Sequence, residues 1–250
     1  LVWMPGVVSS MHIACRSICN LNDSVLIPSV AYPYFHSAPG LSGRGTQAMA
    51  MIQSNRRWVV DQKKLALQID SSSKLMLFCN PHNPGGAVYT RSELSALADL
   101  AVTNDLVVCS DEIHCDLVLE PGMSHIPIAS LNKVIEKRSI TLMAPSKTFN
   151  IAGLSCSFAI IPDDSIRRKF TKACTGIIPY LNLLGTTAAQ AAYEYGGDWN
   201  NQQVIYLRAN RDYLVAELNQ IRGLKLDPVE ATYLAWIDVT ELRLTDPKLF

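Results

Sequence analysis

The chain has 250 residues, of which 48% are hydrophobic and 18% are charged, and its 22 acidic and 22 basic side chains cancel. This composition is typical of a globular protein with enough apolar residues for a sizeable core of α/β type. The densest basic cluster is only Arg167-Arg168-Lys169, so we expect neither a nucleic acid nor a membrane surface as partner.

The hydrophobic periodicity predicts alternating helices and strands between residues 7 and 161. Thr90 and Glu93 have the spacing of a capping box at the start of one helix. The alternation predicts an α/β fold, in which helices cover both faces of a mostly parallel central sheet. In chain order the predicted elements are helix 7–18, strand 24–28, helix 61–69, strand 74–79, helix 90–102, strand 106–109, strand 139–143 and strand 156–161.

The pattern changes after Pro162, where helices are predicted at 186–195 and 198–221 and short strands at 224–226 and 233–239. We expect residues 1–197 to form a large domain and 198–222 a long connecting helix. Residues 223–250 should begin a smaller α+β domain. Since the sequence lacks an initial Met and stops in mid-pattern, we expect a fragment of a longer protein.

No apolar run reaches the roughly 18 to 20 residues of a membrane span, and no charged-then-apolar leader opens the sequence. The seven cysteines form no C-x-x-C pair, and several lie in strand-like apolar runs such as Leu77-Phe78-Cys79. Buried free thiols explain this usage better than disulfide bonds or a zinc site. We therefore expect a cytoplasmic protein without a metal centre.

Polar residues follow three of the predicted strands, at 80–86, 111–116 and 146–147. In open α/β sheets, ligands bind where the strands end at their carboxyl edges. These three segments should therefore meet at one site.

Lys147 and Asp111 carry the chemistry of that site. Lys147 follows a buried strand among small and apolar residues, where desolvation favours a neutral amine that can form an imine with an aldehyde. Asp111 ends another apolar run, and a carboxylate there needs a cation such as a protonated ring nitrogen. Taken singly, each has a plainer interpretation: a surface lysine, and a loop or N-cap aspartate.

Three further positions can contact a flat, phosphorylated ligand. Asn83 lies in a turn rich in Pro and Gly and can donate to a ring oxygen, although its amide could instead bond the local backbone. Tyr32 can stack on a heterocycle. The first amides of helix 7–18, at Val7 and Val8 after Pro5-Gly6, can receive a phosphate, although glycine before a helix is common.

In combination and in this order, N-P-H-N-P-G-G, S-D-E-I-H and A-P-S-K-T-F-N-I-A-G-L resemble the fold-type I enzymes that depend on pyridoxal 5'-phosphate (PLP), the aspartate-aminotransferase superfamily. The steps of 28 residues from Asn83 to Asp111 and 36 from Asp111 to Lys147 fit that family, and the resemblance covers nearly the whole chain. It implies PLP as the cofactor. It also implies a role for each residue: Lys147 as the catalytic residue that binds the aldehyde, Asp111 at the pyridine nitrogen, Asn83 at the ring oxygen, Tyr32 stacked on the ring, and Ser146, Val7 and Val8 as candidates for the phosphate.

His114 points to one branch of this superfamily. It stands three residues after Asp111, where many aminotransferases place a tyrosine that bonds the ring oxygen. The D-E-I-H-x-D-L-V form, His125-Ile126-Pro127 and the segment 230–238 resemble the cystathionine β-lyase-like branch, whose members are C–S lyases and in some cases regulators. No basic residue follows Lys147 before Arg167, so an arginine that many aminotransferases place on the phosphate is absent there.

The resemblance implies α,β-elimination on cystathionine or a related cysteine conjugate, in which Lys147 removes the α-proton and a thiolate leaves. Aminotransfer by the same residues is the first alternative, and a non-catalytic regulatory or binding protein of this fold is the second. The substrate would be a small amino acid, and family members form homodimers. The family's carboxylate-binding arginine and its N-terminal segment have no counterpart in this chain, so we expect weak or no turnover from it alone.

Overall fold

A central sheet organises residues 1–246, the part of the chain that the computed structural model describes. The strands of this sheet are β1 (Val2–Met4), β2 (Ser24–Pro28), β3 (Gly45–Met49), β6 (Ser73–Cys79), β7 (Val107–Asp111), β8 (Ser139–Met143) and β9 (Ser157–Ile160). A separate hairpin consists of β4 (Met51–Ser54) and β5 (Arg57–Val60). The helices are α1 (Val7–Ile18), α2 (Pro33–Leu41), α3 (Gln62–Gln68), α4 (Arg91–Thr103), α5 (Lys133–Glu136), α6 (Asp164–Cys174), α7 (Leu183–Tyr195) and α8 (Gly197–Leu218), with short 3-10 turns at Ile128–Ser130, Ala152–Leu154 and Thr240–Leu242.

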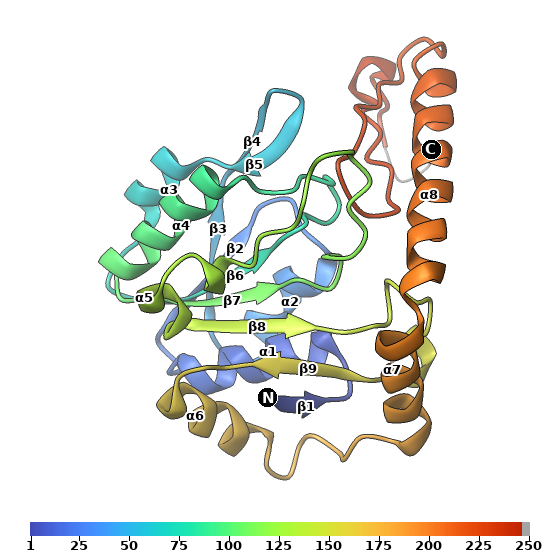
Figure 1. The fold of residues 1–250 in the computed structure, drawn as a ribbon. Coiled ribbons are helices and arrows are strands. Elements are labelled where there is room, and N and C mark those ends of the chain that lie inside the picture. Colours follow the sequence, from blue (N-terminus) through green and yellow to red (C-terminus); the bar gives the residue numbers. More distant parts are fainter. Residues whose placement is uncertain (247–250) are drawn as a thin grey trace.

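The strand order is β1-β9-β8-β7-β6-β2-β3, and all neighbours from β8 to β3 are parallel (Figure 1). Strand β9 is antiparallel to β8, and β1 is antiparallel to β9, so β1 runs in the same direction as β8. The predicted mostly parallel sheet is therefore confirmed. The carboxyl ends of β1, β2, β6, β7 and β8 all lie at one edge of it.

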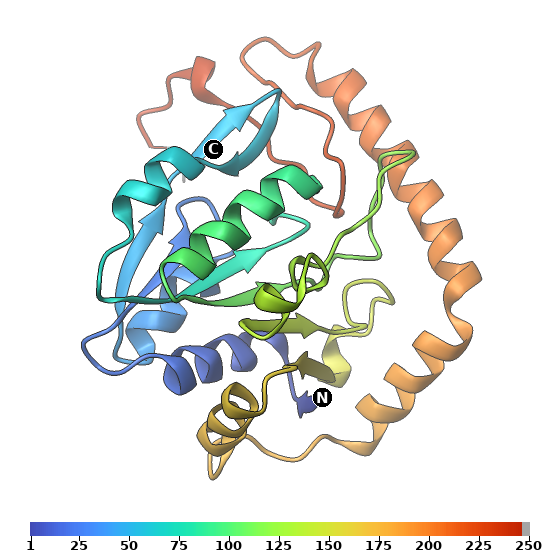
Figure 2. The same cartoon turned by 60° about the vertical axis from the view of Figure 1, so that its left-hand side comes forward.

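Helices cover both faces of the sheet because the side chains of its strands alternate between two buried clusters. In β6, Leu75 and Leu77 belong to the cluster under α1, α2 and α6, whereas Met76 and Phe78 belong to the cluster under α3, α4 and α5. Figure 2 shows α4 lying across the second of these faces. Strands that are buried on both sides explain the nearly continuous apolar runs of the sequence.

Helix α4 begins with the capping box that the sequence predicts. The Thr90 hydroxyl accepts from the Glu93 amide at 3.3 Å, and the Glu93 carboxylate accepts from the Thr90 amide at 2.7 Å. Two amides that the helix itself leaves without partners are satisfied in this way. The cap fixes the direction in which the chain leaves the loop after β6.

The strands predicted at 224–226 and 233–239 do not form within the described residues. Only an isolated bridge joins Lys225 to Asp238 there, and a second joins Val118 to Ala231. A strand needs a partner along its length, and residues 223–246 lie beside α8 rather than at an edge of the sheet (Figure 1). The prediction of strands in this segment was therefore wrong.

The two last helices carry many exposed apolar side chains. In α8, which lies wholly inside the described range, no residue is buried, and Ile205, Tyr206 and Tyr213 are each about two-thirds exposed. None of the helices in residues 1–246 combines the length and the apolarity that crossing a bilayer requires.

Candidate active site

The carboxyl ends of four parallel strands lie at one edge of the sheet, and they include the three at which the sequence predicts a site. Tyr32 follows β2, Asn83 follows β6, Asp111 ends β7, and Lys147 follows β8. Because β6, β7 and β8 are adjacent, Asn83, Asp111 and Lys147 come from neighbouring strand ends. Strand β1 points the same way, so the start of α1 reaches this edge as well.

Lys147 lies in a tight turn directly after β8. The Phe149 amide donates to the Pro145 carbonyl at 2.8 Å, and the Ile151 amide donates to the Ser146 carbonyl at 3.1 Å, which fixes the turn. The lysine is half-buried between the buried residues Pro145 and Thr148. Its positive charge lowers the pKa of the Asp111 carboxyl group and that of the His114 ring, so the three side chains interact electrostatically.

Asp111 is buried, with 6% of its surface exposed, and accepts a hydrogen bond from the Ile113 amide at 3.1 Å. Burial raises the pKa of its carboxyl group to about 7, and the charge of Glu112 adds to the rise. The Ile113 amide and the charge of Lys147 lower this pKa and offset part of the effect. A cationic group placed against Asp111 would favour its ionised form further.

His114 is buried, and its ring meets the ring of Tyr233 edge-on at a centroid distance of 5.7 Å. Burial lowers the pKa of this imidazole to about 4, and the charge of Lys147 lowers it further. The ring is therefore neutral near pH 7, with one N–H donor and one acceptor nitrogen. Within residues 1–246 neither nitrogen has a hydrogen-bond partner, so both are available to a polar ligand.

The loop that carries Asn83 is fixed by backbone hydrogen bonds. The His82 amide donates to the Ala87 carbonyl at 2.8 Å, and the Gly86 amide donates to the His82 carbonyl at 2.7 Å. Asn80 is buried and accepts from the Tyr89 amide at 3.1 Å, so it serves the loop itself. The Asn83 side chain is half-buried and makes no hydrogen bond to the residues that the structure describes, which leaves its amide free to donate to a ligand.

Tyr32 and the start of α1 complete the site. Tyr32 is the N-cap residue of α2 and is half-buried, with its ring 5.2 Å from that of Tyr34. Helix α1 begins after Gly6 with no side-chain cap, so the amides of Val7 and Val8 remain open at a helix N-terminus, where anions bind well. Ser146 is half-buried at the same edge of the sheet. This set of groups can hold a flat, anionic heterocycle, and the individual roles predicted from the sequence stay predictions.

Several contacts between separate segments of the chain were not predicted from the sequence. Sequence reasoning did not predict the pairing of Glu112 with His125 at 2.8 Å, although both stand in segments that it singled out. It also missed Tyr233 as the neighbour of His114, and the ion pair between Arg57 and Glu230 at 2.8 Å. Each contact joins residues from separate segments of the chain. The sequence shows only local groupings such as Ser110-Asp111-Glu112, and these do not reveal a distant partner.

Comparison with known proteins places this site in a family. The family model described as aminotransferase class I and II matches residues 1–250. Cystathionine beta-lyase PatB of Bacillus subtilis (strain 168) is 35% identical over 256 residues, which cover 100% of this chain and 65% of PatB. The crystal structure of OvoB is similar with a TM-score of 0.97 and 46% identity, over 99% of this chain and 65% of OvoB. The PLP-bound C–S lyase from Staphylococcus hominis gives a TM-score of 0.88 and 32% identity, over 98% of this chain and 63% of that one. The chain therefore spans slightly less than two thirds of the length of these relatives.

Proposed function

Because this chain belongs to the aminotransferase class I and II family, we propose that its site binds PLP and that the protein is a PLP-dependent enzyme. The observation that carries this proposal is the grouping of Lys147 with buried Asp111 and His114 at one sheet edge. Asp111, whose pKa is about 7, can pair as a carboxylate with a protonated pyridine nitrogen. The neutral imidazole of His114, which has no hydrogen-bond partner among the described residues, can donate a hydrogen bond to a ring oxygen. The likeness to a PLP-bound C–S lyase supports the same cofactor.

In this proposal each site residue would face a particular part of PLP. Lys147 would bind the aldehyde carbon, and Asp111 the ring nitrogen. Asn83 and His114 would face the ring oxygen, and Tyr32 one face of the ring. The phosphate would lie against the Val7 and Val8 amides and the Ser146 hydroxyl.

When bound, PLP supplies an electron sink for charge that develops at the substrate's α-carbon. The residues of the chain supply the rest of the chemistry. Lys147, as a free amine, takes the α-proton and holds it at Nζ. Asp111, when ionised, would lie against the ring nitrogen and favour the protonated form of that nitrogen. Half-burial of Lys147 and Asn83 limits the access of water to these groups.

We propose C–S β-lyase activity, with cystathionine or a related cysteine conjugate as the substrate. The similarity to PatB and to the Staphylococcus hominis enzyme supports this class, as does histidine at position 114. Amino transfer on the same residues is the alternative, and the family description supports it. A protein that binds PLP and a partner without turnover is a further alternative.

The test uses full-length protein that contains these residues. With PLP it should show a visible absorbance band that Lys147→Ala abolishes and that Lys169→Ala, at an exposed lysine of α6, retains. Cystathionine and water should then yield homocysteine, pyruvate and ammonia. Transfer of the amino group to a 2-oxo acid without pyruvate would support the aminotransferase instead, and a band without any turnover would support the binding protein. A Lys147→Ala variant that keeps the band would overturn the proposed site.

The remaining features of the protein are proposals of the same kind. We propose a cytoplasmic protein, because all seven cysteines are free thiols within the described residues. We propose a homodimer, supported by exposed apolar side chains before and at the start of α7, such as Ile177, Tyr180 and Leu183. The division into a large domain (1–197), a connecting helix (198–222) and a second domain from residue 223 onward also stays a prediction, and its last residues, 247–250, lie outside the described range.

A further inference from the structure

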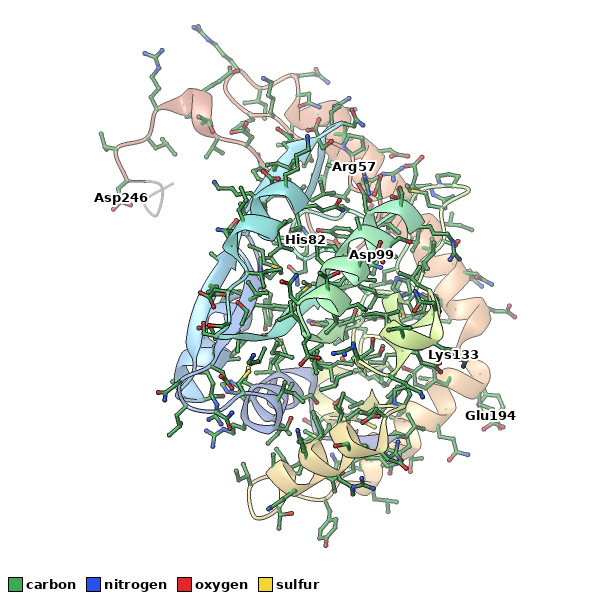
Figure 3. All side chains as sticks on the ribbon, turned by 90° about the vertical axis from the view of Figure 1, so that its left-hand side faces the viewer. Arg57, His82, Asp99, Lys133, Glu194 and Asp246 are labelled. Atoms are coloured by element: carbon green, nitrogen blue, oxygen red, sulfur yellow. The ribbon has the colours of Figure 1, made fainter. Side chains whose placement is uncertain are left out.

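His82 is a buried histidine that the proposed chemistry does not use. It lies in the loop after β6, one residue before Asn83, and only 1% of its surface is exposed. Figure 3 shows it near the middle of the view, whereas Lys133 and Glu194 lie towards the outer side. Its backbone is held on both sides, because its amide donates to Ala87 and its carbonyl accepts from Gly86.

The ring of His82 reaches across to a second loop of the site. Its Nε2 atom lies 2.9 Å from the carbonyl oxygen of Val30, which is two residues before Tyr32. Because a carbonyl oxygen can only accept, Nε2 must carry the proton and Nδ1 must be the bare nitrogen. Burial lowers the pKa of this imidazole to about 4, so the ring stays in this neutral form across the physiological range.

The surroundings of Nδ1 indicate that His82 is needed for its hydrogen bond to Val30 rather than for its volume. Nδ1 is buried and has no hydrogen-bond partner within residues 1–246. A buried acceptor without a donor costs free energy, and an apolar side chain of similar size would avoid that cost. Leucine could fill the same space, but it could not donate the hydrogen bond that Nε2 of His82 gives to the Val30 carbonyl.

The space for the ring depends on Gly85. A Cβ atom at position 85 would lie 2.7 Å from Nδ1 of His82 and 2.8 Å from Cβ of Trp58. Real Cβ atoms essentially never show contacts this short, so any larger residue at position 85 would force both the His82 ring and the Trp58 side chain to shift. The position of the His82 ring therefore depends on glycine at position 85, in the same loop that carries Asn83.

We infer that His82 is a positioning residue, which sets the distance between Asn83 and Tyr32 by joining their two loops through Val30. The inference rests on the proposed function, in which Asn83 faces the ring oxygen and Tyr32 one face of the ring. His82 does not touch the cofactor in this arrangement. It acts by holding two loops that do, across the adjacent ends of β6 and β2.

The experiment compares three variants of the full-length protein by titration with PLP. His82→Leu keeps most of the bulk but loses the donor, and His82→Gln keeps an N–H that can reach a carbonyl. Ile135→Ala, at a fully buried position of α5 in the buried cluster under α3, α4 and α5, serves as the control for a general loss of core packing. The dissociation constant of PLP, the pH midpoint of the visible band of bound PLP and the thermal unfolding temperature are measured for each.

We expect His82→Leu to weaken PLP binding by roughly tenfold, the factor that one lost hydrogen bond of about 1.4 kcal/mol produces. The pH midpoint of the band should rise, because an amide donor that no longer reaches the ring oxygen stabilises its negative charge less. His82→Gln should recover most of both effects. Ile135→Ala should lower the unfolding temperature but leave the dissociation constant and the midpoint unchanged.

Gly85→Ala gives a second route if His82→Leu does not fold. It leaves the histidine in place and displaces its ring, so it should change the dissociation constant and the midpoint in the same direction as His82→Leu. Wild-type PLP affinity and midpoint in His82→Leu, or in Gly85→Ala where only that variant folds, would overturn the inference and leave the proposed function intact. Failure of the parent protein to show a band that depends on Lys147 would overturn the proposed function and this inference together.

Discussion

The Oε2 atom of Glu112 lies 2.8 Å from the Nε2 atom of His125, and Glu112 is the residue directly after Asp111 in the chain. The other carboxylate oxygen of Glu112 accepts from the Ser110 hydroxyl at 2.9 Å, and only 1% of the Glu112 side chain is exposed. Its charge is one of the causes that raise the pKa of Asp111. A buried acid with its own partners therefore acts on the acid that we propose to hold the cofactor.

Glu112→Gln should lower the pKa of Asp111. The substitution keeps a side chain that can bond Ser110 and His125 but removes the negative charge that opposes ionisation of Asp111. The expected decrease is on the order of half a unit to one unit, typical of one nearby charge in a protein interior. Carbon-13 NMR of the Asp111 carboxyl group without PLP measures it. Glu194→Gln, at an exposed position of α7, is the control, and an unchanged Asp111 pKa in Glu112→Gln would contradict the prediction.

Asp111→Asn should stabilise the protein without PLP, and more so at high pH. The pKa of Asp111 is about 7 in the folded chain, whereas an aspartate in water has an ordinary pKa of 3.8. Between these values the folded chain keeps a proton that the unfolded chain has lost, so the contribution of Asp111 to stability falls as the pH rises from about 4 to about 7. Asparagine does not titrate. The variant should gain up to about 4 kcal/mol relative to the parent at pH 8, and little at pH 4.

Urea unfolding of both proteins at several pH values tests this difference. Comparing the two proteins at each pH cancels the opposite contributions of His82 and His114, whose lowered pKa values make the fold lose stability as the pH falls from about 6.5 to about 4. A difference in stability that does not change with pH would rule out a raised pKa for Asp111. With PLP present, the parent should gain more stability than the variant, since only the parent can pair an ionised carboxylate with the ring nitrogen.

Glu230→Ala should destabilise the protein by about 1 to 3 kcal/mol, because it removes the acceptor of the buried Val88 amide and one of the two carboxylates that pair with Arg57. Glu230 forms an ion pair with Arg57 at 2.8 Å and accepts from the Val88 amide at 2.7 Å. Its backbone carbonyl also accepts from the Leu119 amide. Glu230 therefore connects the β4–β5 hairpin, through Arg57, with the loop after β6 and the loop after β7. Glu230→Gln should cost less, since its amide oxygen can still accept from Val88.

Urea unfolding gives these values, and Glu241→Gln, at an exposed ion pair with Lys225, is the control for charge alone. A double-mutant cycle that combines Glu230→Ala with Arg57→Gln measures the coupling energy between these two side chains. Because Arg57 also pairs with Glu93 at 2.8 Å, the coupling energy should be smaller than the loss in Glu230→Ala. Equal stability of Glu230→Ala and the parent protein would contradict the prediction.

Much of the sheet could be predicted because its strands are buried on both faces. The apolar runs at β2, β6, β7 and β8 therefore stand out, and the polar residues after them mark the site edge. The elements that were missed lack such runs. Helix α2 contains Pro39 and Gly40, which are typical of turns, and β3 is largely exposed.

The contacts between loops could not be predicted for a different reason. His82 and Val30 are 52 residues apart, and Arg57 and Glu230 are farther apart still, so no local pattern joins them. The segment 233–239 shows the opposite failure. Its apolar and aromatic residues are typical of a strand, but strand formation depends on a neighbour, which the described residues do not supply at that place.

The position of β1 in the sheet imposes an order on assembly. Strand β1 pairs only with β9 among the described strands, and β9 separates it from β8. Residues 2–4 therefore cannot join the sheet until residues 157–160 are in place. Helix α1, which carries the Val7 and Val8 amides, follows β1 directly. A pairing between segments this far apart in the chain carries a large loop-closure cost, so we expect the contact of β1 with β9 to form late.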